Sequence, residues 1–123
     1  MRSRSVKKEA RFFKALADDT RLAILALLSW REELCVCDIL TVLELTQSKA
    51  SRHLRYLTQA GILEDRREAV WVYYRISSDL PPLEAGIVKS IQTHFDSKPY
   101  AALKKKLDSW LARKGNKPLC KCT

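Results

Sequence analysis

The first half of the chain alternates between apolar and polar positions with a period close to that of an α-helix. One such segment covers residues 6–17, with its apolar residues on one side. Asp18, Asp19 and Thr20 follow, and their side chains can cap a new helix. The next segment, residues 21–30, is apolar on nearly all sides, which is typical of the buried centre of a small domain. The pattern therefore predicts two consecutive helices, the second of them central.

Two further helices are predicted after these. Residues 32–37 indicate a short connection, after which apolar positions spaced i, i+3, i+4 and i+7 predict a helix that ends near Leu43. A tight turn with a capping Ser or Thr at residues 45–48 separates it from a helix over residues 49–60. Gly61 stands where a helix-terminating glycine is expected. The inward side of the second helix carries three apolar residues, which are Ala50, Leu54 and Leu57.

The hydrophobic period then shortens to that of a β-strand. Residues 70–76 alternate β-branched and aromatic residues, and residues 63–67 precede them as a first strand. The turn of this hairpin is expected at residues 66–69. Prolines break the chain, and two amphipathic helices are predicted over residues 83–95 and 100–113. The fold class is therefore mainly α with a β-hairpin wing, which is the order of a winged helix-turn-helix domain.

Length and composition indicate one domain with a polyanionic partner. The 123 residues suit a single domain over residues 1–113, followed by a basic, cysteine-containing tail over residues 114–123. Lys and Arg total 23 against 14 Asp and Glu, a net charge of +9 that favours nucleic acid as partner. The sequence holds no apolar run long enough for a transmembrane helix, and its basic start is not followed by the apolar stretch of a secretory signal. The expected location is therefore the cytoplasm.

The predicted helix-turn-helix supplies candidate DNA contacts. Its second helix is expected to enter the major groove, while the hairpin lies along the DNA backbone. Arg66 and Arg67, at the expected hairpin tip, are candidates for phosphate contacts. The alternative is an ordinary solvated helix face, and His53 is expected to be a hydrogen-bonded interface residue rather than a DNA reader or a ligand. The outward residues that can bind base edges and phosphates are Ser48, Lys49, Ser51, Arg52 and Arg55.

Four cysteines form two close pairs, Cys35 with Cys37 and Cys120 with Cys122. In a reducing compartment, cysteines are more often metal ligands or redox groups than structural disulfides. Two cysteines separated by one residue lie about 200° apart on a regular helix, so they can hold one ion only in an extended or unwound segment. Binding at Cys35 and Cys37 should therefore distort the start of the first helix of the helix-turn-helix. That distortion would re-aim the reading helix.

Several segments resemble the ArsR/SmtB family of metal-sensing repressors. Residues 33–38, with the sequence Glu-Leu-Cys-Val-Cys-Asp, resemble the metal-binding box of its arsenic-responsive branch. Residues 48–54 resemble its recognition helix, and residues 60–63, 65–67 and 71–76 resemble its wing. The resemblance implies a dimeric repressor of operator DNA that is released when arsenite or antimonite binds through three sulfurs. It implies no enzymatic activity and no required cofactor.

The chain departs from the family pattern at two positions. Leu40 stands where a third box cysteine is common, and Ala69 stands where the wing turn usually has glycine. The third thiolate must then come from elsewhere, and Cys120 or Cys122 is the candidate, with Lys121 favouring thiolate formation. The alternatives are spare thiols in the tail, a zinc site of all four cysteines, and a redox switch at the box. A thiol enzyme lacks support because the chain has no Cys-x-x-Cys motif.

The terminal helices are expected to form a homodimer, as the family resemblance implies. Their apolar residues exceed what a lone small domain needs, and a symmetric dimer would read DNA half-sites roughly 34–36 Å apart. No second metal site is expected on the last helices, because His94 has Asp96 nearby and no second histidine. The expected interface residues are Phe12, Phe13, Leu16, Leu103, Leu107 and Trp110.

Overall fold

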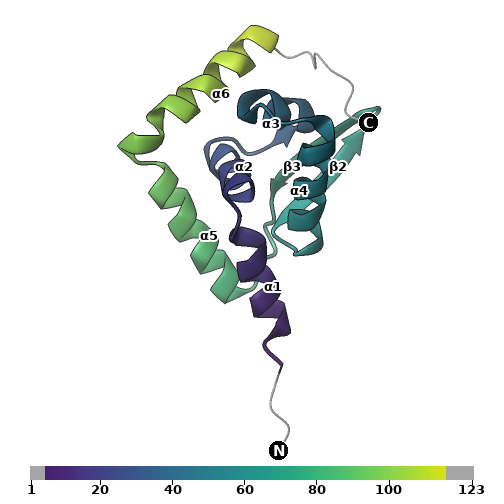
Figure 1. The fold of residues 1–123 in the computed structure, drawn as a ribbon, viewed down its shortest axis with the longest axis vertical. Helices are drawn as coiled ribbons and strands as arrows, with labels where there is room; N and C mark the ends of the chain where they lie inside the picture. The colour runs from purple at the N-terminus through teal and green to yellow at the C-terminus, as the bar shows by residue number, and fades with distance from the viewer. Residues whose placement is uncertain (1–4, 116–123) are drawn as a thin grey trace, which may run out of the picture.

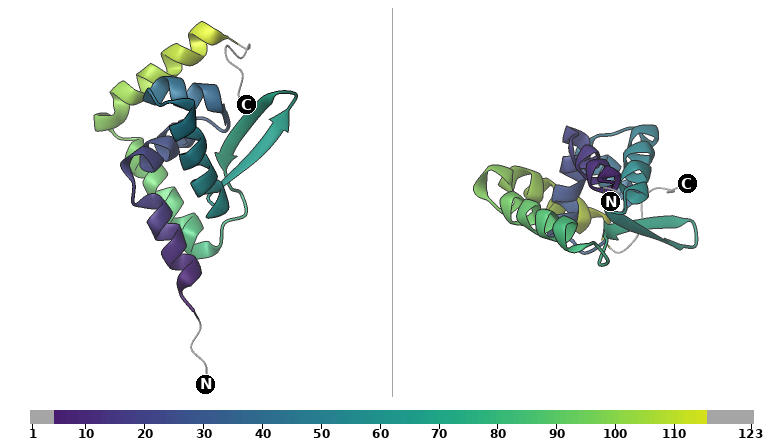
Figure 2. Two further views of the ribbon diagram at one scale, coloured as in Figure 1. Left: turned by 45° about the vertical axis from the view of Figure 1, so that its right-hand side comes forward. Right: turned by 90° about the horizontal axis from the view of Figure 1, so that it is seen from below.

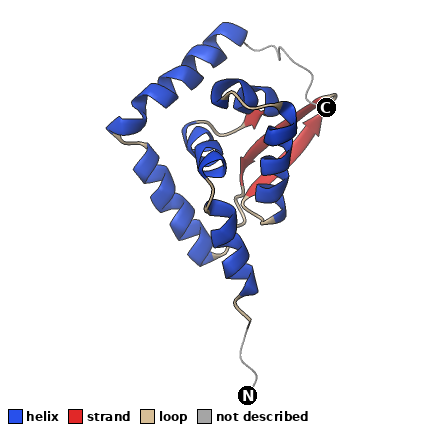
Figure 3. Cartoon of the chain, in the orientation of Figure 1, coloured by secondary structure: helices blue, strands red, loops and turns tan. Residues whose placement is uncertain are grey.

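A computed structural model describes residues 5–115 and confirms the winged helix-turn-helix fold. Helices make up most of this part of the chain, and the strands form one small sheet (Figure 3). None of the helices in residues 5–115 is long and apolar enough to cross a membrane. In chain order the elements are α1 (Lys7–Leu16), α2 (Asp19–Trp30), β1 (Leu34–Cys35), α3 (Val36–Leu43), α4 (Gln47–Gln59), β2 (Leu63–Glu68), β3 (Trp71–Ile76), α5 (Pro82–Phe95), the short 3-10 helix η1 (Lys98–Tyr100) and α6 (Ala101–Lys114).

Helix α2 lies at the centre of the molecule, as its sequence predicts. It packs against the other five α-helices and β3, and residues 24–28 are all buried. Helices α5 and α6 form a bent arm along one side, and α3, α4 and the sheet lie on the other (Figure 1). Asp18 caps α2 by accepting a hydrogen bond of 3.0 Å from the backbone N–H of Arg21. This hydrogen bond is the main reason that the pKa of Asp18 is lowered.

The sheet includes a strand that the sequence pattern does not predict. The expected connection at residues 32–37 contains β1, which pairs antiparallel with β3 so that Leu34 lies opposite Tyr74 and Cys35 opposite Tyr73. A strand of two residues is too short to show an alternating pattern. The strand order is β1-β3-β2, so β3 is central. This pairing anchors the start of α3 to the sheet.

The hairpin turn lies later in the chain than expected. Arg66 and Arg67 lie within β2, opposite Tyr73 and Val72, so the turn prediction at residues 66–69 is wrong. The tip is formed instead by residues 69–70. The β2–β3 hairpin stands away from the helical body beside α4 (Figure 2), and the end of β2 is exposed. Because most of β2 is exposed, a run of charged residues is compatible with a strand here, although the same run in the sequence is typical of a loop.

The turn holds Ala69 at φ +57°, a conformation that favours glycine. Ala69→Gly is expected to raise the free energy of unfolding by about 1 kcal/mol, because glycine adopts positive φ without steric cost. Chemical denaturation of both proteins would measure the difference. Val70→Gly is the matched control, since Val70 does not have positive φ and glycine there should destabilise the hairpin. Equal effects of the two substitutions, or a loss of stability on Ala69→Gly, would contradict the strain at Ala69.

Candidate functional site

Helix α4 presents a polar face to solvent and an apolar face to the core. Thr46 caps it by accepting a hydrogen bond of 3.1 Å from the backbone N–H of Lys49. The inward-facing prediction is confirmed, because Ala50, Leu54 and Leu57 are fully buried. Of the five outward candidates, Ser51 is half-buried and four are exposed, namely Ser48, Lys49, Arg52 and Arg55.

The two arginines of the wing have different surroundings. Arg67 lines a recess of about 350 Å³ between α4 and the hairpin, together with Ser51 and Arg55. The Arg66 guanidinium donates two hydrogen bonds to Glu33, of 2.7 and 2.8 Å, and one of 3.1 Å to Glu68. These carboxylates raise its pKa, chiefly through the hydrogen bonds that it donates to Glu33. Arg66 is thus held against the sheet, whereas Arg67 faces the recess beside α4.

His53 joins α4 to the start of α2. Its Nδ1 lies 3.3 Å from Nη1 of Arg21 and 3.8 Å from the carboxylate of Asp18. The Arg21 guanidinium also stacks over the ring of Tyr56, at 4.1 Å from its centroid. The prediction that His53 is a hydrogen-bonded residue is confirmed.

The box cysteines lie on either side of the junction between β1 and α3. Cys35 ends β1 and is the N-cap of α3, with extended backbone angles of φ −74° and ψ 154°. Cys37 is the second residue of α3. Both side chains are 1% exposed, so neither sulfur is accessible without movement of the chain. Cys37 is disulfide-bonded in the structure, so it can act as a ligand only after reduction.

Cys35 and Asp38 form a capping box at the start of α3. The Cys35 sulfur accepts from the backbone N–H of Asp38, and the Asp38 carboxylate accepts a hydrogen bond of 2.9 Å from the backbone N–H of Cys35. Sequence reasoning assigned no role to Asp38, although a carboxylate three residues after an N-cap is a known helix-start signal. A candidate ligand is therefore part of the local structure that begins the helix.

Helix α6 reaches the same carboxylate. The indole N–H of Trp110 donates a hydrogen bond of 2.8 Å to Oδ1 of Asp38. Nζ of Lys114 lies 2.5 Å from the same oxygen, and the Lys114 side chain is only 11% exposed. Lys114 was expected to begin the tail, but it is the last residue of α6. Residues 38, 110 and 114 are thus brought together by the tertiary fold.

Tyr73 lies opposite Cys35 in the sheet, and its pKa responds to the charges around the junction of β1 and α3. Its pKa is raised, first by burial and then by the nearby Cys35 and Glu68. Lys114 and Arg66 act in the opposite direction. The surroundings of the box therefore contain cationic groups from both α6 and the wing.

The residues described do not complete a three-ligand site. Within residues 5–115, no three His, Cys, Asp or Glu side chains lie together as a metal site. Leu40, at the family's third cysteine position, is half-buried. The candidates Cys120 and Cys122, and the adjacent Lys121, lie outside the described residues. The expectation that the tail completes the ligand set therefore stays a prediction.

Comparisons with known proteins agree with the winged helix-turn-helix fold. Residues 18–65 match the profile described as "Bacterial regulatory protein, arsR family". HlyU from Vibrio cholerae N16961 is 30% identical, with a TM-score of 0.65, and the match covers 78% of this chain and all of that one. The chain belongs to the ArsR family. Its matched region contains the capped start of α2, the box and the whole of α4.

Two further similar proteins have names that concern metalloids. The arsenical resistance operon repressor of Escherichia coli K12 is 51% identical over 76 residues, which are 62% of this chain and 65% of that protein. The AntR antimony-specific transcriptional repressor is 28% identical with a TM-score of 0.58, over 69% of this chain and 74% of that one. This chain thus spans slightly less than two thirds of the arsenical repressor. The family and these relatives are transcriptional regulators rather than enzymes.

Proposed function

We propose that the protein is a metalloid-responsive transcriptional repressor. A homodimer binds operator DNA and leaves it when arsenite or antimonite binds the thiolates of Cys35 and Cys37. The observation that carries this function is the place of the two cysteines, at the start of the first helix of the helix-turn-helix, with Cys35 as its N-cap. The names of the arsenical and antimony repressors support the choice of inducer.

DNA binding is assigned to α4 and the wing. The exposed face of α4 carries Lys49, Arg52 and Arg55, and the recess beside it is also lined by Arg67. Arginine side chains bind guanine edges and phosphates, and a net charge of +9 favours a polyanion. Operator affinity should therefore fall steeply as salt rises.

Three of the six residues expected at a dimer interface are buried within the single chain. Phe12, Leu16 and Leu107 are at most 8% exposed in the single chain, so they belong to its own core. Phe13 is 48% exposed on α1 and Leu83 is 52% exposed on α5. The expectation that all six apolar residues were surplus to the monomer is therefore wrong.

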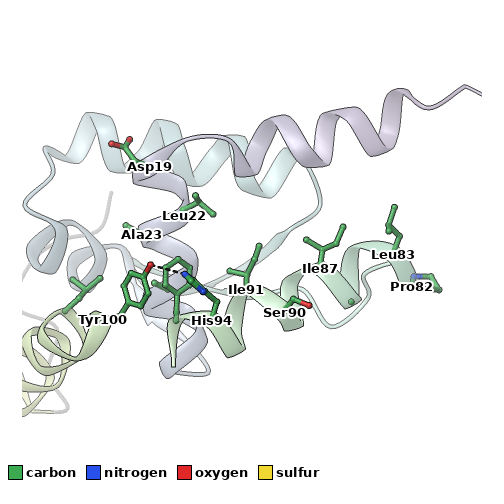
Figure 4. A pocket seen from close by; sticks show the side chains of 14 residues that line it. Asp19, Leu22, Ala23, Pro82, Leu83, Ile87, Ser90, Ile91, His94 and Tyr100 are labelled. Atoms are coloured by element: carbon green, nitrogen blue, oxygen red, sulfur yellow. Dashed lines mark hydrogen bonds between the residues drawn. The ribbon is translucent and has the colours of Figure 1, made fainter. Parts of the chain in front are cut away.

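An apolar groove beside the terminal helices provides the surface for a second copy. It has a volume of about 830 Å³ between α2, α5 and the start of α6. Leu22 and Ala23 of α2 face Ile87 and Ile91 of α5 across it, and His94 is hydrogen-bonded to Tyr100 at its end (Figure 4). An open apolar surface of this kind favours association. Sedimentation should give a dimer at micromolar concentration, and a monomer would contradict this interface.

The inducer is expected to act by opening the first turn of α3. Soft thiolates bind thiophilic ions, and both sulfurs are buried, so a bound metalloid requires local rearrangement. The third sulfur is assigned to Cys120 or Cys122, while zinc bound by all four cysteines is a less favoured alternative. No resident cofactor is required by this mechanism.

X-ray absorption of the arsenite complex, in the presence of reductant, tests the ligand set by counting sulfur neighbours of arsenic. The full chain is expected to show three, and a chain truncated after Lys117 is expected to show two. Three in both proteins would assign the third sulfur to an added thiol rather than to the tail. Fewer than two in the full chain would contradict binding at the box.

The wing arginines give a prediction about DNA affinity. Arg67→Ala should weaken binding to all sequences alike and reduce the salt slope by about one, as the loss of a phosphate contact does. Arg66→Ala should have a smaller effect, because Glu33 and Glu68 already bind its guanidinium. Anisotropy titrations at several salt concentrations measure both. Equal losses would show that Arg66 leaves Glu33 to bind DNA.

A cysteine redox switch is the second candidate, and the disulfide at Cys37 favours it. Oxidation would then change operator affinity without any metalloid. Measurements under full reduction separate the two functions: a metalloid-responsive repressor stays on DNA until arsenite is added. Release by an oxidant, with no response to arsenite, would favour the redox switch.

A further inference from the structure

The buried carboxylate of Asp38 joins two parts of the molecule that lie far apart in the sequence. Its Oδ2 accepts from the backbone N–H of Cys35 at 2.9 Å, at the start of α3. Its Oδ1 accepts from the indole of Trp110 at 2.8 Å and from the ammonium of Lys114 at 2.5 Å, on α6. Asp38 is only 2% exposed, so these protein groups replace water around the charge. One carboxylate oxygen thus binds the start of α3, and the other binds α6.

The Cys35 end of this connection depends on the sulfur. The Cys35 sulfur accepts from the backbone N–H of Asp38, so the sulfur and the carboxylate cap the helix together. A metalloid bound to that sulfur takes electron density that the cap uses, and both sulfurs are buried, so a metalloid can reach them only if the first turn rearranges. Asp38 lies in that turn, next to Cys37. A change there must move the carboxylate relative to Trp110 and Lys114 or pull them with it.

We propose that Asp38 is a positioning residue that transmits occupancy of the thiol site to α6 through Trp110 and Lys114. The proposal rests on the proposed function, because it assumes that a metalloid binds the box. It adds a second route for the signal: besides tilting the helix-turn-helix, the bound ion shifts the C-terminal helix. Because α6 borders the apolar groove assigned to the second copy, that shift would alter how the two reading helices are spaced.

Two ion pairs between α6 and the rest of the domain are exposed and do not involve the box. Lys106 pairs with Glu44, the C-cap of α3, at 2.8 Å, and Arg31 pairs with Asp108 at 2.8 Å. Their side chains are 44% to 80% exposed, so solvent and salt weaken them. Lys106 therefore offers a matched control, because it connects α6 to the opposite end of the same helix.

Trp110 provides a direct spectroscopic readout. The chain has three tryptophans, and a Trp30→Phe/Trp71→Phe background leaves Trp110 as the one emitter. Arsenite added to the reduced, DNA-free protein should shift its emission, with saturation at the same ratio as thiol binding measured by loss of titratable thiols. Asp38→Asn in this background should reduce the shift, while Lys106→Ala should leave it unchanged. A Trp110 emission spectrum that does not change when arsenite is bound would overturn the proposal.

The coupling itself is measured with a Trp110→Phe/Lys114→Met variant. This variant removes the α6 side of the connection and leaves both cysteines and Asp38 in place. It should bind arsenite with the wild-type stoichiometry but need at least about tenfold more arsenite to release operator DNA, within the usual range of coupling between two sites. Circular dichroism and operator affinity without arsenite check that the variant is folded. If it does not fold, Trp110→Phe alone takes its place, with a smaller expected effect.

The outcomes separate this proposal from the function on which it rests. If wild-type protein neither binds arsenite nor releases DNA, the proposed function fails. If wild type is released normally and the double variant is released at the same arsenite concentration, the function stands and the role of Asp38 is refuted. If Lys106→Ala impairs release as much as the double variant does, α6 matters only through general stability, and the specific route is also refuted.

Discussion

Cys35→Ser and Cys37→Ser proteins should bind operator DNA as the wild type does and remain bound when arsenite is added. Serine is a good N-cap, so Cys35→Ser keeps an acceptor for the backbone N–H of Asp38 and preserves the start of α3. What it removes is the soft ligand, and oxygen is a poor substitute for sulfur toward a thiophilic ion. Anisotropy of a labelled operator, titrated with arsenite under reduction, measures the loss of response.

A second substitution at Cys37 is needed as a folding control, because the Cys37 side chain is buried. A serine hydroxyl in that position costs about 1–3 kcal/mol if it finds no partner, so Cys37→Ala serves as the control for folding. Both Cys37 variants should fail to respond to arsenite.

A variant that lacks both Cys120 and Cys122 should respond only at higher arsenite if the tail supplies the third sulfur. Normal release of both box variants would refute the thiol mechanism at Cys35 and Cys37.

The second large effect is expected at the reading helix. Arg52→Ala should relax operator preference, with a cost on the order of 1–3 kcal/mol for a lost bidentate base contact. Arg52 is exposed on α4, whose opposite face is buried through Ala50, Leu54 and Leu57. Binding to an operator selected from random DNA, compared with single-base variants of it, measures the preference.

Lys105→Ala is the matched control for charge. Lys105 is exposed on α6, so its removal lowers the net charge equally without touching α4. It should weaken binding slightly and leave the preference among sequences unchanged. If Arg52→Ala behaves like Lys105→Ala, α4 does not read bases through Arg52.

Periodicity was sufficient to predict the main helices and the wing. The wholly apolar stretch of α2 and the buried side of α4 both lie where a helical period places them. The Thr46 cap and the positive φ of Gly61 were also predictable, because they depend on local residue chemistry. These features need no knowledge of distant parts of the chain.

The sequence-based predictions that were wrong or missing concern contacts between residues far apart in the chain. An amphipathic face indicates that Phe12 and Leu107 are buried, but it does not say whether their own chain or a second copy covers them. The pairing of β1 with β3 depends on a partner about forty residues away, and two residues carry no period of their own. The junction of Asp38 with Trp110 and Lys114 has the same cause, because residue 110 lies 72 positions from residue 38.

The site was partly predictable for chemical reasons. The spacing of Cys35 and Cys37 excludes joint binding of one ion on a regular helix, and the structure places one on each side of the helix start. The hydrogen-bonded role of His53 was expected, but its partners, Arg21 and Asp18, were not. Ala69, which stands where the family usually has glycine, adopts the positive φ that favours glycine, and the residue type alone does not predict this.

Release of operator DNA by arsenite is the most direct test of the central claim. Fully reduced wild-type dimer is bound to labelled operator, arsenite is added in steps, and anisotropy is recorded beside the count of remaining thiols. The proposed mechanism predicts release that is complete near one arsenite per protomer and that parallels the loss of thiols. Operator that stays bound after the box thiols are occupied would contradict a repressor switched at Cys35 and Cys37.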